Sequence, residues 1–220
     1  MKDNILKNFI KHGIKIINKE KYEKYVAKMR EKAQNLPDFT LMTSDCMGGL
    51  IYHTLGRKFL SPTINMSIKD TDFLKLVSDE PYYYSLPINF VPYNKYPIGY
   101  IGEGSRKIEL RFEHYNSADS AQRKWNERKQ RVCENRFIIM ADQNLNDTEI
   151  AQFKALKVTR KLMFTWNPER DDGQEIFYIK SYGKSVIKNY SKLNPNGFRD
   201  YEIFFDFVAW LGMKNDFMLE

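Results

Sequence analysis

Two patterns of hydrophobic residues follow one another along this 220-residue chain. Within residues 1–36, apolar residues recur every three or four positions, which is typical of amphipathic helices. These residues are Leu6, Ile10, Ile14, Ile17, Tyr22, Tyr25, Val26 and Met29. After Pro37, short apolar runs alternate with segments of helical period. Such alternation indicates an α/β structure with a largely parallel sheet. We therefore expect a helical arm over residues 1–36 and one α/β domain over residues 37–220.

The two periods also place the individual elements after Pro37. Residues 81–106 fit neither period, because they hold four prolines and many tyrosines, and we expect an irregular loop there. Long loops inside compact domains tend to be functional. The predicted strands are residues 39–43, 107–113, 136–141, 160–165 and 175–181. The predicted helices are residues 48–56, 71–78, 117–133, 147–156 and 201–211.

Three reactive side chains follow predicted strands. His114 and Asp142 each come directly after a predicted strand, and Cys46 is the third residue after another. In open α/β sheets the ligand crevice lies beyond the carboxyl ends of the strands, so parallel strands would bring these residues to one edge. A thiol, an imidazole and a carboxylate are the parts of a nucleophile, its base and the group that orients the base. We expect a catalytic group of this kind, with Ser44 as a second candidate for the nucleophile.

The segment SDCMGG, residues 44–49, marks a turn from a strand to a helix. Free amides at a helix start can bind an anion, and they favour the thiolate form of Cys46. Gly48 and Gly49 would let a ligand approach the backbone closely. The alternative is a buried cysteine in a turn that needs glycine, with Ser44 or Asp45 as the helix cap. The sequence leaves both interpretations open.

Two further features have both a structural and a functional interpretation. His114 is in phase with the apolar face of residues 107–113, so it is either a core residue or a general base. On the helix 117–133, arginines and a tryptophan share one stripe of about a third of the circumference. Such a stripe could clamp a phosphate or carboxylate and stack a sugar or base. The default alternative is a solvated charged face. The stripe consists of Trp125, Arg128, Arg131 and Asn135.

The sequence gives little support for a metal site. His12, His53 and His114 are dispersed, with no cysteine or glutamate at ligand spacing, so we expect no zinc site. Asp70-Thr71-Asp72 has the acid-x-acid spacing by which many glycosyltransferases hold a metal and a nucleotide diphosphate. Either aspartate could equally cap the helix that follows.

The positive charge of the chain is local. Residues 1–36 hold ten Lys or Arg and four Asp or Glu, a net +6, whereas the remainder holds 25 and 24, a net +1. A basic amphipathic arm can lie on an anionic membrane surface, or it can pack on the protein with its lysines in solvent. We expect no nucleic-acid partner, because the main body has no basic stripe interleaved with aromatic residues.

Other patterns bear on the location of the protein. No segment approaches the roughly 20 apolar residues of a membrane-spanning helix. Lysines interrupt every apolar run near the N-terminus, which argues against a secretory signal. Cys46 and Cys133 are better explained as free thiols than as a disulfide. We expect a cytoplasmic protein, with peripheral contact to the inner membrane face through residues 1–36 as an open possibility.

Several spaced motifs resemble those of a known family. They are SDCMGG (44–49), SPT (61–63), YPIGYIGEG (96–104), FEHYNS (112–117), WNERKQRVCEN (125–135) and FIIMAD (137–142). Together they resemble the exopolysaccharide biosynthesis proteins encoded in bacterial capsule and O-antigen gene clusters, over roughly residues 39–165. This chain departs from the family pattern at Asp45 and Met47, where asparagine and tryptophan are usual.

The resemblance implies a three-layer α/β fold with helices on both faces of the sheet, and a role in surface-polysaccharide biosynthesis. Members are often labelled as acetyltransferases, which implies transfer of an acyl group to a sugar hydroxyl. The family motifs correspond to Cys46, Gly48, Gly49, Ser61, Pro62, Thr63, Asp72, Phe73, His114, Tyr115, Trp125, Arg128, Arg131, Asn135 and Asp142.

Our leading hypothesis is an O-acyltransferase that acts on a sugar or a lipid-linked sugar. Cys46 or Ser44 would be the nucleophile, His114 the general base and Asp142 its orienting group. The cofactor is not identified, and acyl-CoA is a candidate donor. The expected substrate-binding residues, with the arginines on an anionic donor or lipid diphosphate, are Asp45, Gly48, Gly49, Tyr115, Trp125, Arg128, Arg131 and Asn135.

Two alternatives remain open at this point. A glycosyltransferase would use Asp70 or Asp72 to bind a nucleotide sugar with a divalent metal. A non-catalytic module would dock on the polysaccharide machinery through the N-terminal arm.

Overall fold

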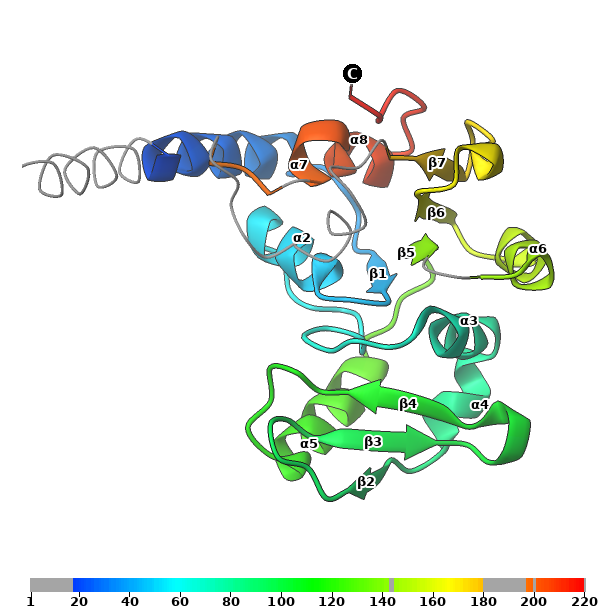
Figure 1. The fold of residues 1–220 in the computed structure, drawn as a ribbon. Helices are drawn as coiled ribbons and strands as arrows, with labels where there is room; N and C mark the ends of the chain where they lie inside the picture. The colour runs from blue at the N-terminus through cyan, green and yellow to red at the C-terminus, as the bar shows by residue number, and fades with distance from the viewer. Residues whose placement is uncertain (1–17, 143–144, 180–196, 200, 220) are drawn as a thin grey trace, which may run out of the picture. The chain divides into compact units, whose positions relative to one another are not determined.

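The computed structural model describes residues 18–142, 145–179, 197–199 and 201–219 (Figure 1). These residues fall into two compact units. The first contains residues up to Pro37, residues 51–57 and the residues from 197 onward, and the second contains residues 38–50 and 58–179. The described N-terminal residues thus fall in one unit with C-terminal residues. The arm over 1–36 and the α/β domain over 37–220 stay a prediction.

A four-stranded parallel sheet in the order β1-β5-β6-β7 is the centre of the second unit, and it confirms the predicted α/β class. Its longer strands are nearly continuous apolar runs in which most residues are buried, as in parallel sheets that are covered by helices. The strands are β1 (Thr40–Thr43), β5 (Arg136–Asp142), β6 (Arg160–Thr165) and β7 (Ile176–Tyr178).

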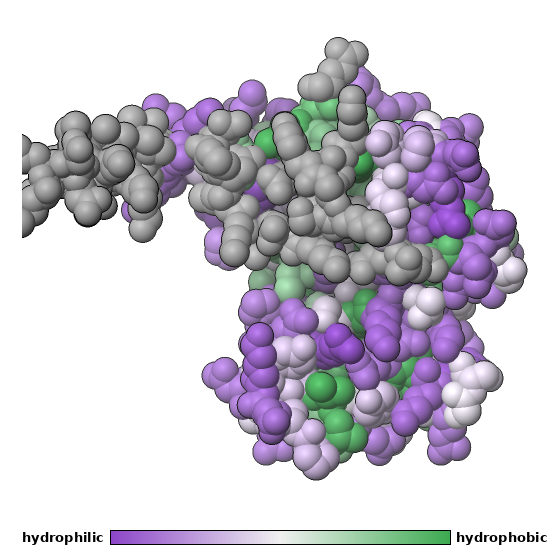
Figure 2. Space-filling model, in the orientation of Figure 1, coloured by the Kyte–Doolittle hydropathy of each residue, from purple (hydrophilic) through white to green (hydrophobic). Residues whose placement is uncertain are grey.

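A second, antiparallel sheet in the order β2-β3-β4 corrects two predictions. Residues 107–113 do not join the parallel sheet, and residues 81–106 are not an irregular loop. Buried and less buried positions alternate along β3 and β4, so the two strands share one apolar face and pair with each other. Hydrophilic side chains cover much of the side of this sheet visible in Figure 2. The segment contains α4 (Glu80–Ser85), β2 (Asn89–Val91), β3 (Ile98–Ile101), the 3-10 turn η1 (Gly104–Arg106) and β4 (Ile108–Arg111).

The predicted helices are found close to their expected bounds, with one exception. Residues 201–211 form two short helices, because the side chain of Asp206 accepts hydrogen bonds from the amides of Val208 and Ala209 and starts a new helix there. The helices are α2 (Met47–Leu55), α3 (Asp70–Ser78), α5 (Ala118–Lys129), α6 (Asp147–Ala155), α7 (Tyr201–Phe204) and α8 (Phe207–Leu211); a 3-10 turn, η2 (Pro168–Arg170), follows β6.

One hydrophobic core joins the two sheets of the second unit. It contains Met42 and Met140 from the parallel sheet and Leu110 from the antiparallel sheet, all nearly inaccessible to solvent. Phe73 of α3 and Trp125 of α5 belong to the same cluster and are equally buried. A continuous core of this kind fixes the end of β1 relative to the end of β4.

In the first unit, residues 18–32 form a helix whose less exposed positions are those predicted from the sequence. The hydroxyl of Tyr22 donates to Glu202 Oε1 (3.1 Å), and the ring of Tyr25 packs edge-on against Phe198, with 5.3 Å between centroids. The apolar side of the helix is therefore covered within its own unit. The predicted apolar positions 6, 10, 14 and 17 lie outside the described residues. Among the described residues, no helix is long and apolar enough to cross a membrane.

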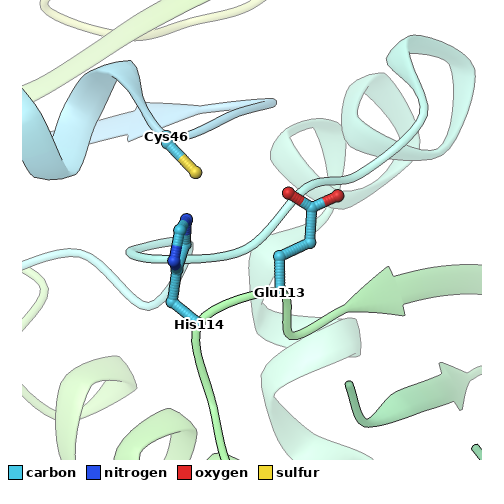
Figure 3. A group of neighbouring side chains, drawn as sticks. All are labelled: Cys46, Glu113 and His114. Carbon is cyan, nitrogen blue, oxygen red and sulfur yellow. The ribbon is translucent and has the colours of Figure 1, made fainter. Parts of the chain in front are cut away.

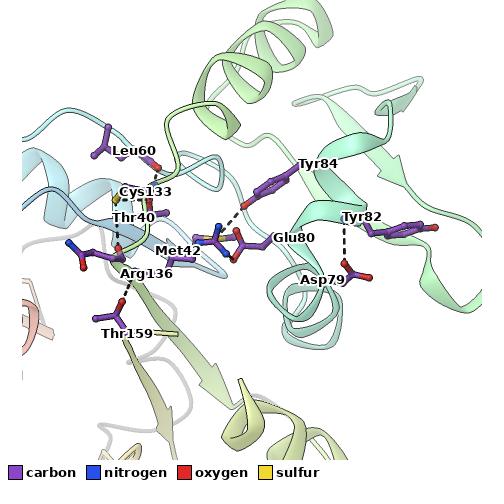
Figure 4. A network of polar contacts seen from close by, with 11 residues as sticks. Thr40, Met42, Leu60, Asp79, Glu80, Tyr82, Tyr84, Cys133, Arg136 and Thr159 are labelled. Atoms are coloured by element: carbon purple, nitrogen blue, oxygen red, sulfur yellow. Dashed lines mark hydrogen bonds and ion pairs between the residues drawn. The ribbon is translucent and has the colours of Figure 1, made fainter. Parts of the chain in front are cut away.

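A buried carboxylate at the start of α4 lies near the start of β5 (Figure 4). Glu80 is 3% exposed and pairs with Arg136 (3.4 Å). Burial raises the pKa of Glu80, against the opposing effects of Arg136 and of the Tyr84 hydroxyl. The second cysteine is nearby: the amide of Cys133 donates to Thr40 Oγ1 (2.9 Å). Both cysteines are free, as predicted.

The loop before β7 provides a test of stability against pH. Asp172 Oδ1 accepts hydrogen bonds from the amides of Glu175 and Ile176 (2.9 Å each), and Oδ2 pairs with Lys154 (2.8 Å). Partial burial opposes ionisation, but the Lys154 ammonium and the amides lower the pKa of Asp172 from 3.8 to about 2.

We expect Asp172→Asn to lower the free energy of unfolding by about 1 kcal/mol at pH 7, allowing for solvent screening. Because the folded-state pKa is depressed, this contribution is fully present above about pH 4, the ordinary range of an aspartate, and is lost as the pH falls towards 2. Urea unfolding of the unchanged protein and of Asp172→Asn between pH 7 and pH 3 measures the contribution of Asp172. Glu134→Gln, at an exposed residue, is the control. A difference in the free energy of unfolding that stays constant over this pH range would contradict a lowered pKa of Asp172.

Candidate functional site

The carboxyl ends of β1, β5 and β6 share one edge of the parallel sheet, as the strand pattern predicted. Ser44, Asp45 and Cys46 follow β1 directly, and α2 begins at the next residue. An open cleft with a volume of about 360 Å³ lies at this edge. Its lining residues are Ser44, Asp45, Ser67, Ile68, Lys69, Asp70, Thr71, Arg111 and Leu145.

The first amides of α2 already have partners within the protein. Asp45 Oδ1 accepts a hydrogen bond from the amide of Met47 (2.8 Å), and Thr43 Oγ1 accepts one from the amide of Gly48 (3.1 Å). Asp45 is therefore the helix cap, which was the structural alternative in the sequence. Both amides donate to side chains of the protein, so the expectation that they bind an anion is wrong for Met47 and Gly48.

The two glycines of α2 are explained by packing. A β-carbon on Gly48 would lie 2.9 Å from Thr43 Oγ1, and one on Gly49 would lie 3.2 Å from Asn65 Oδ1. These neighbours are protein atoms of the same unit, so close packing requires glycine at Gly48 and favours it at Gly49. The predicted role in ligand approach is not needed to explain either residue.

Three side chains with different chemistry meet beside the cleft: Cys46, Glu113 and His114 (Figure 3). The Cys46 sulfur, a carboxylate oxygen of Glu113 and an imidazole nitrogen of His114 all lie within 4.8 Å of one another. Cys46 is half-buried, whereas the other two are exposed. The sulfur points from the start of α2 towards the imidazole ring, and the carboxylate lies beside them. The predicted meeting of Cys46 and His114 is therefore observed.

A short bridging segment brings the end of β4 to the end of β1. Ser67 exchanges two backbone hydrogen bonds with Arg111 (2.9 and 3.0 Å), next to the end of the antiparallel sheet. The amide of the following residue, Ile68, donates to the carbonyl of Ser44 (2.8 Å), just after the parallel strand. His114 thus reaches Cys46 through this bridge, although its strand is not in the parallel sheet.

His114 is not a core residue. Ile108, Leu110 and Phe112 are buried, but the chain turns at Glu113 and His114, and both side chains are exposed. The turn interrupts the alternation that placed His114 in phase with the buried residues. The imidazole is therefore accessible to a ligand at the cleft.

The charges around Cys46 do not favour its thiolate. Burial, followed by the carboxylates of Asp45 and Glu113, raises the pKa of the Cys46 thiol to about 12. Burial also raises the pKa of Asp45 to about 7, to which Asp70 and Glu113 contribute, while the amide of Met47 opposes the shift. The expected preference for a thiolate is thus wrong, and deprotonation of Cys46 needs a base or a cation beside it.

Asp142 does not orient His114. It is 2% exposed, and its Oδ2 accepts hydrogen bonds from Thr165 Oγ1 (2.9 Å) and Arg170 Nη1 (2.6 Å). Its Oδ1 accepts one from the amide of Leu145 (3.1 Å). The carboxylate beside the imidazole is Glu113, which the sequence analysis missed. Its position next to His114 at a strand end is the signal that could have identified it.

Two members of the predicted stripe on α5 are buried and have partners within the protein. Trp125 is 1% exposed and packs edge-on against Tyr84, with 5.8 Å between ring centroids. Arg128 is buried and donates to the carbonyl of Ile64 (3.1 Å), which also accepts from the hydroxyl of Tyr115 (2.9 Å). These residues hold the loop before the bridging segment, so Arg128 and Tyr115 have structural roles.

The remaining predicted residues also have local partners. Arg131 pairs with Glu127 (3.5 Å), and the side chain of Asn135 donates to the carbonyl of Asp38 (3.1 Å). Asp72 accepts a hydrogen bond from the amide of Glu109 (3.0 Å) and so connects α3 with β4. Both Asp70 and Asp72 lie in the first turn of α3, where carboxylates interact favourably with the helix dipole.

Two comparisons with known proteins place the chain. Residues 15–212 match the model of a family described as "Domain of unknown function (DUF1919)". A protein of Haemophilus influenzae, described as an "Uncharacterized protein", is 31% identical over 178 residues, which cover 78% of this chain and 82% of the relative. The match to the family spans the whole of the candidate site.

Proposed function

This chain belongs to the DUF1919 family, and we propose that it is an acyltransferase of surface-polysaccharide assembly, which transfers an acyl group from a thioester donor to a sugar hydroxyl. The observation that carries the proposal is the meeting of the Cys46 sulfur and the His114 imidazole within 4.8 Å, at the carboxyl edge of the parallel sheet. This edge is where α/β proteins bind their ligands.

In the first half of the reaction, the Cys46 sulfur attacks the carbonyl carbon of the donor thioester. His114 takes the thiol proton as the carbon–sulfur bond forms, so no free thiolate is needed beforehand. The bond between the carbonyl carbon and the donor sulfur then breaks, and His114 returns the proton to the leaving thiolate. An acyl group remains on Cys46.

In the second half, a sugar hydroxyl attacks the carbonyl carbon of the acyl-cysteine. His114 takes the hydroxyl proton, the new ester forms, and the Cys46 sulfur leaves and regains the proton from His114. The thiol and the neutral imidazole are restored, so atoms and protons balance over the cycle.

Glu113 supports this use of a neutral thiol. Its carboxylate raises the pKa of Cys46, but the same negative charge stabilises the imidazolium that forms on His114 during each proton transfer. This is the task that was predicted for Asp142. The hydroxyl of Ser67 donates to Glu113 Oε1 (2.7 Å) and helps to hold the carboxylate in place.

The charged residues of the cleft replace the α5 stripe as the proposed donor-binding groups. Lys69 is exposed, and Arg111 is half-buried with its Nε on Glu109 Oε1 (2.6 Å). Both line the cleft and could bind a phosphate of the donor or of a lipid diphosphate. Acyl-CoA, a thioester with phosphate groups, is the donor class that fits this combination.

The N-terminal helix supports a substrate at a membrane surface. The apolar side of residues 18–32 is covered within its own unit, so contact would use its exposed lysines rather than insertion. These are Lys19, Lys21, Lys24, Lys28 and Lys32. A lipid-linked sugar at an anionic membrane face is therefore the proposed acceptor, and no nucleic acid is required.

Deletion of the gene tests the proposal in the cell. We expect the surface polysaccharide of the deletion strain to lose ester-linked acetate, and the original gene to restore it. Genes with Cys46→Ala or His114→Ala should not restore it, whereas Cys133→Ser should. Nuclear magnetic resonance of the purified polysaccharide measures the acetate content. Unchanged acetate after deletion, or full rescue by both site variants, would refute the proposal.

A further inference from the structure

We propose that Cys46, Glu113 and His114 form a binding site for a single zinc ion, and that zinc held there blocks acyl transfer. Only the blocking effect rests on the proposed function. The sequence predicted no zinc site, because the histidines are dispersed and no cysteine or glutamate was recognised at ligand spacing. The fold brings Cys46 from one segment to Glu113 and His114 of another.

The three donor atoms have the chemistry that zinc prefers. A thiolate sulfur, an imidazole nitrogen and a carboxylate oxygen are its usual protein ligands, whereas magnesium and calcium prefer oxygen alone. Sites with three protein ligands leave a fourth position for water or another small ligand. The group Cys46, Glu113 and His114 is therefore an open zinc site and not a closed structural one.

The geometry needs only small adjustments. Ligand atoms around a tetrahedral zinc ion lie about 3.5 Å apart, from bond lengths of about 2.0–2.3 Å. The three atoms lie within 4.8 Å of one another, so they need to close by roughly 1 Å. Glu113 and His114 are exposed and follow the strand in a turn, so their side chains have room to move. Cys46 is fixed by the first turn of α2, where its carbonyl accepts from Leu50 (3.1 Å).

A partner outside the ligand group already holds one oxygen of Glu113. The hydroxyl of Ser67 donates to Oε1 (2.7 Å), which leaves Oε2 for the ion. Ser67 is fixed in turn by its two backbone hydrogen bonds to Arg111. Hydrogen bonds of this kind orient metal ligands and raise affinity.

The surrounding charge also suits a cation. The carboxylates of Asp45 and Asp70 line the adjoining cleft together with the cationic groups of Lys69 and Arg111. Arg111 is already paired with Glu109, which reduces its repulsion of a bound ion. A divalent ion between Cys46 and Glu113 would therefore lie close to the Asp45 carboxylate, whose negative charge favours a cation.

Zinc at this site would prevent the proposed reaction for a simple reason. A sulfur and an imidazole nitrogen that coordinate zinc cannot attack a thioester or accept a proton. The enzyme would be inactive with zinc bound and active after a chelator removes it.

Titration of the purified full-length protein with zinc, in competition with a chromophoric chelator, tests the site. We expect one zinc ion per chain, and an affinity lowered about 100-fold or more by Cys46→Ser or His114→Ala and about tenfold by Ser67→Ala. The matched controls Cys133→Ser and His53→Ala should bind zinc unchanged. Cobalt(II) in place of zinc should give a thiolate-to-metal absorption band in the near ultraviolet, which Cys46→Ser removes. Circular dichroism checks that each variant is folded.

The results separate the zinc site from the proposed function. Binding that survives both Cys46→Ser and His114→Ala, or a cobalt spectrum without a thiolate band, would overturn the site. Acyl transfer that continues at saturating zinc would overturn the blocking effect alone. The titration needs no catalysis, so a failure of the acyltransferase proposal would remove the blocking effect and leave the binding result standing.

Discussion

Replacement of His114 by alanine is expected to lower the rate of acyl transfer to a sugar acceptor by about 10²- to 10⁴-fold, the usual contribution of a general base. The expected loss is near the upper end, because burial and two carboxylates hold the pKa of the Cys46 thiol at about 12. Without a base, almost no thiolate is present at neutral pH. The fold should not change, because the side chain of His114 is exposed.

Rapid-mixing kinetics with excess enzyme, a thioester donor and a sugar acceptor measure this rate. His53→Ala is the matched control, because His53 is an exposed histidine of α2 outside the cluster of Cys46, Glu113 and His114. Glu113→Gln should lower the rate less than His114→Ala, since it removes only the charge that stabilises the imidazolium. A rate for His114→Ala equal to that of the unchanged protein would show that His114 is not the base.

Replacement of Asp142 by alanine is expected to lower the free energy of unfolding by about 3 kcal/mol, because it breaks a buried ion pair. Removal of this carboxylate leaves Arg170 Nη1, the Thr165 hydroxyl and the amide of Leu145 without their acceptor. Buried groups that lose a partner in this way cost more than the net value of the bond.

Urea unfolding measures this loss, and Asp147→Ala is the control. Asp147 also pairs with Arg170 (3.7 Å), but its side chain is fully exposed, so its removal should have little effect. The folded fraction of Asp142→Ala should keep most of its acyl-transfer rate if Asp142 is structural. A variant with normal stability and a strongly reduced rate would instead support a catalytic role for Asp142.

The sequence predicted the parallel sheet well, for a physical reason. Strands buried on both faces are continuous apolar runs, and residues 160–165 were predicted with the limits that β6 has. The rule that ligands bind beyond strand ends also selected Cys46 correctly. It selected His114 for the wrong reason, because β4 belongs to the antiparallel sheet and its end is held near β1 by the segment that contains Ser67.

Other features depend on contacts that periodicity cannot show. The stripe containing Arg128 was predicted to bind an anionic ligand, but a long arginine can be buried when a carbonyl such as that of Ile64 accepts its hydrogen bond. β2 and β3 were missed because prolines and tyrosines obscure two very short strands. Glu113 was missed because it was predicted as the last residue of a strand, whereas in the fold it lies in a turn beside Cys46.

The most direct test of the central claim is mass spectrometry of the protein after incubation with acetyl-CoA and without a sugar acceptor. We predict one acetyl group on the peptide that contains Cys46, little or none on Cys133, and its loss when a sugar acceptor is added. The His114→Ala protein should acquire the label far more slowly. A protein that remains unlabelled at Cys46, or that labels Cys133 equally, would contradict the account.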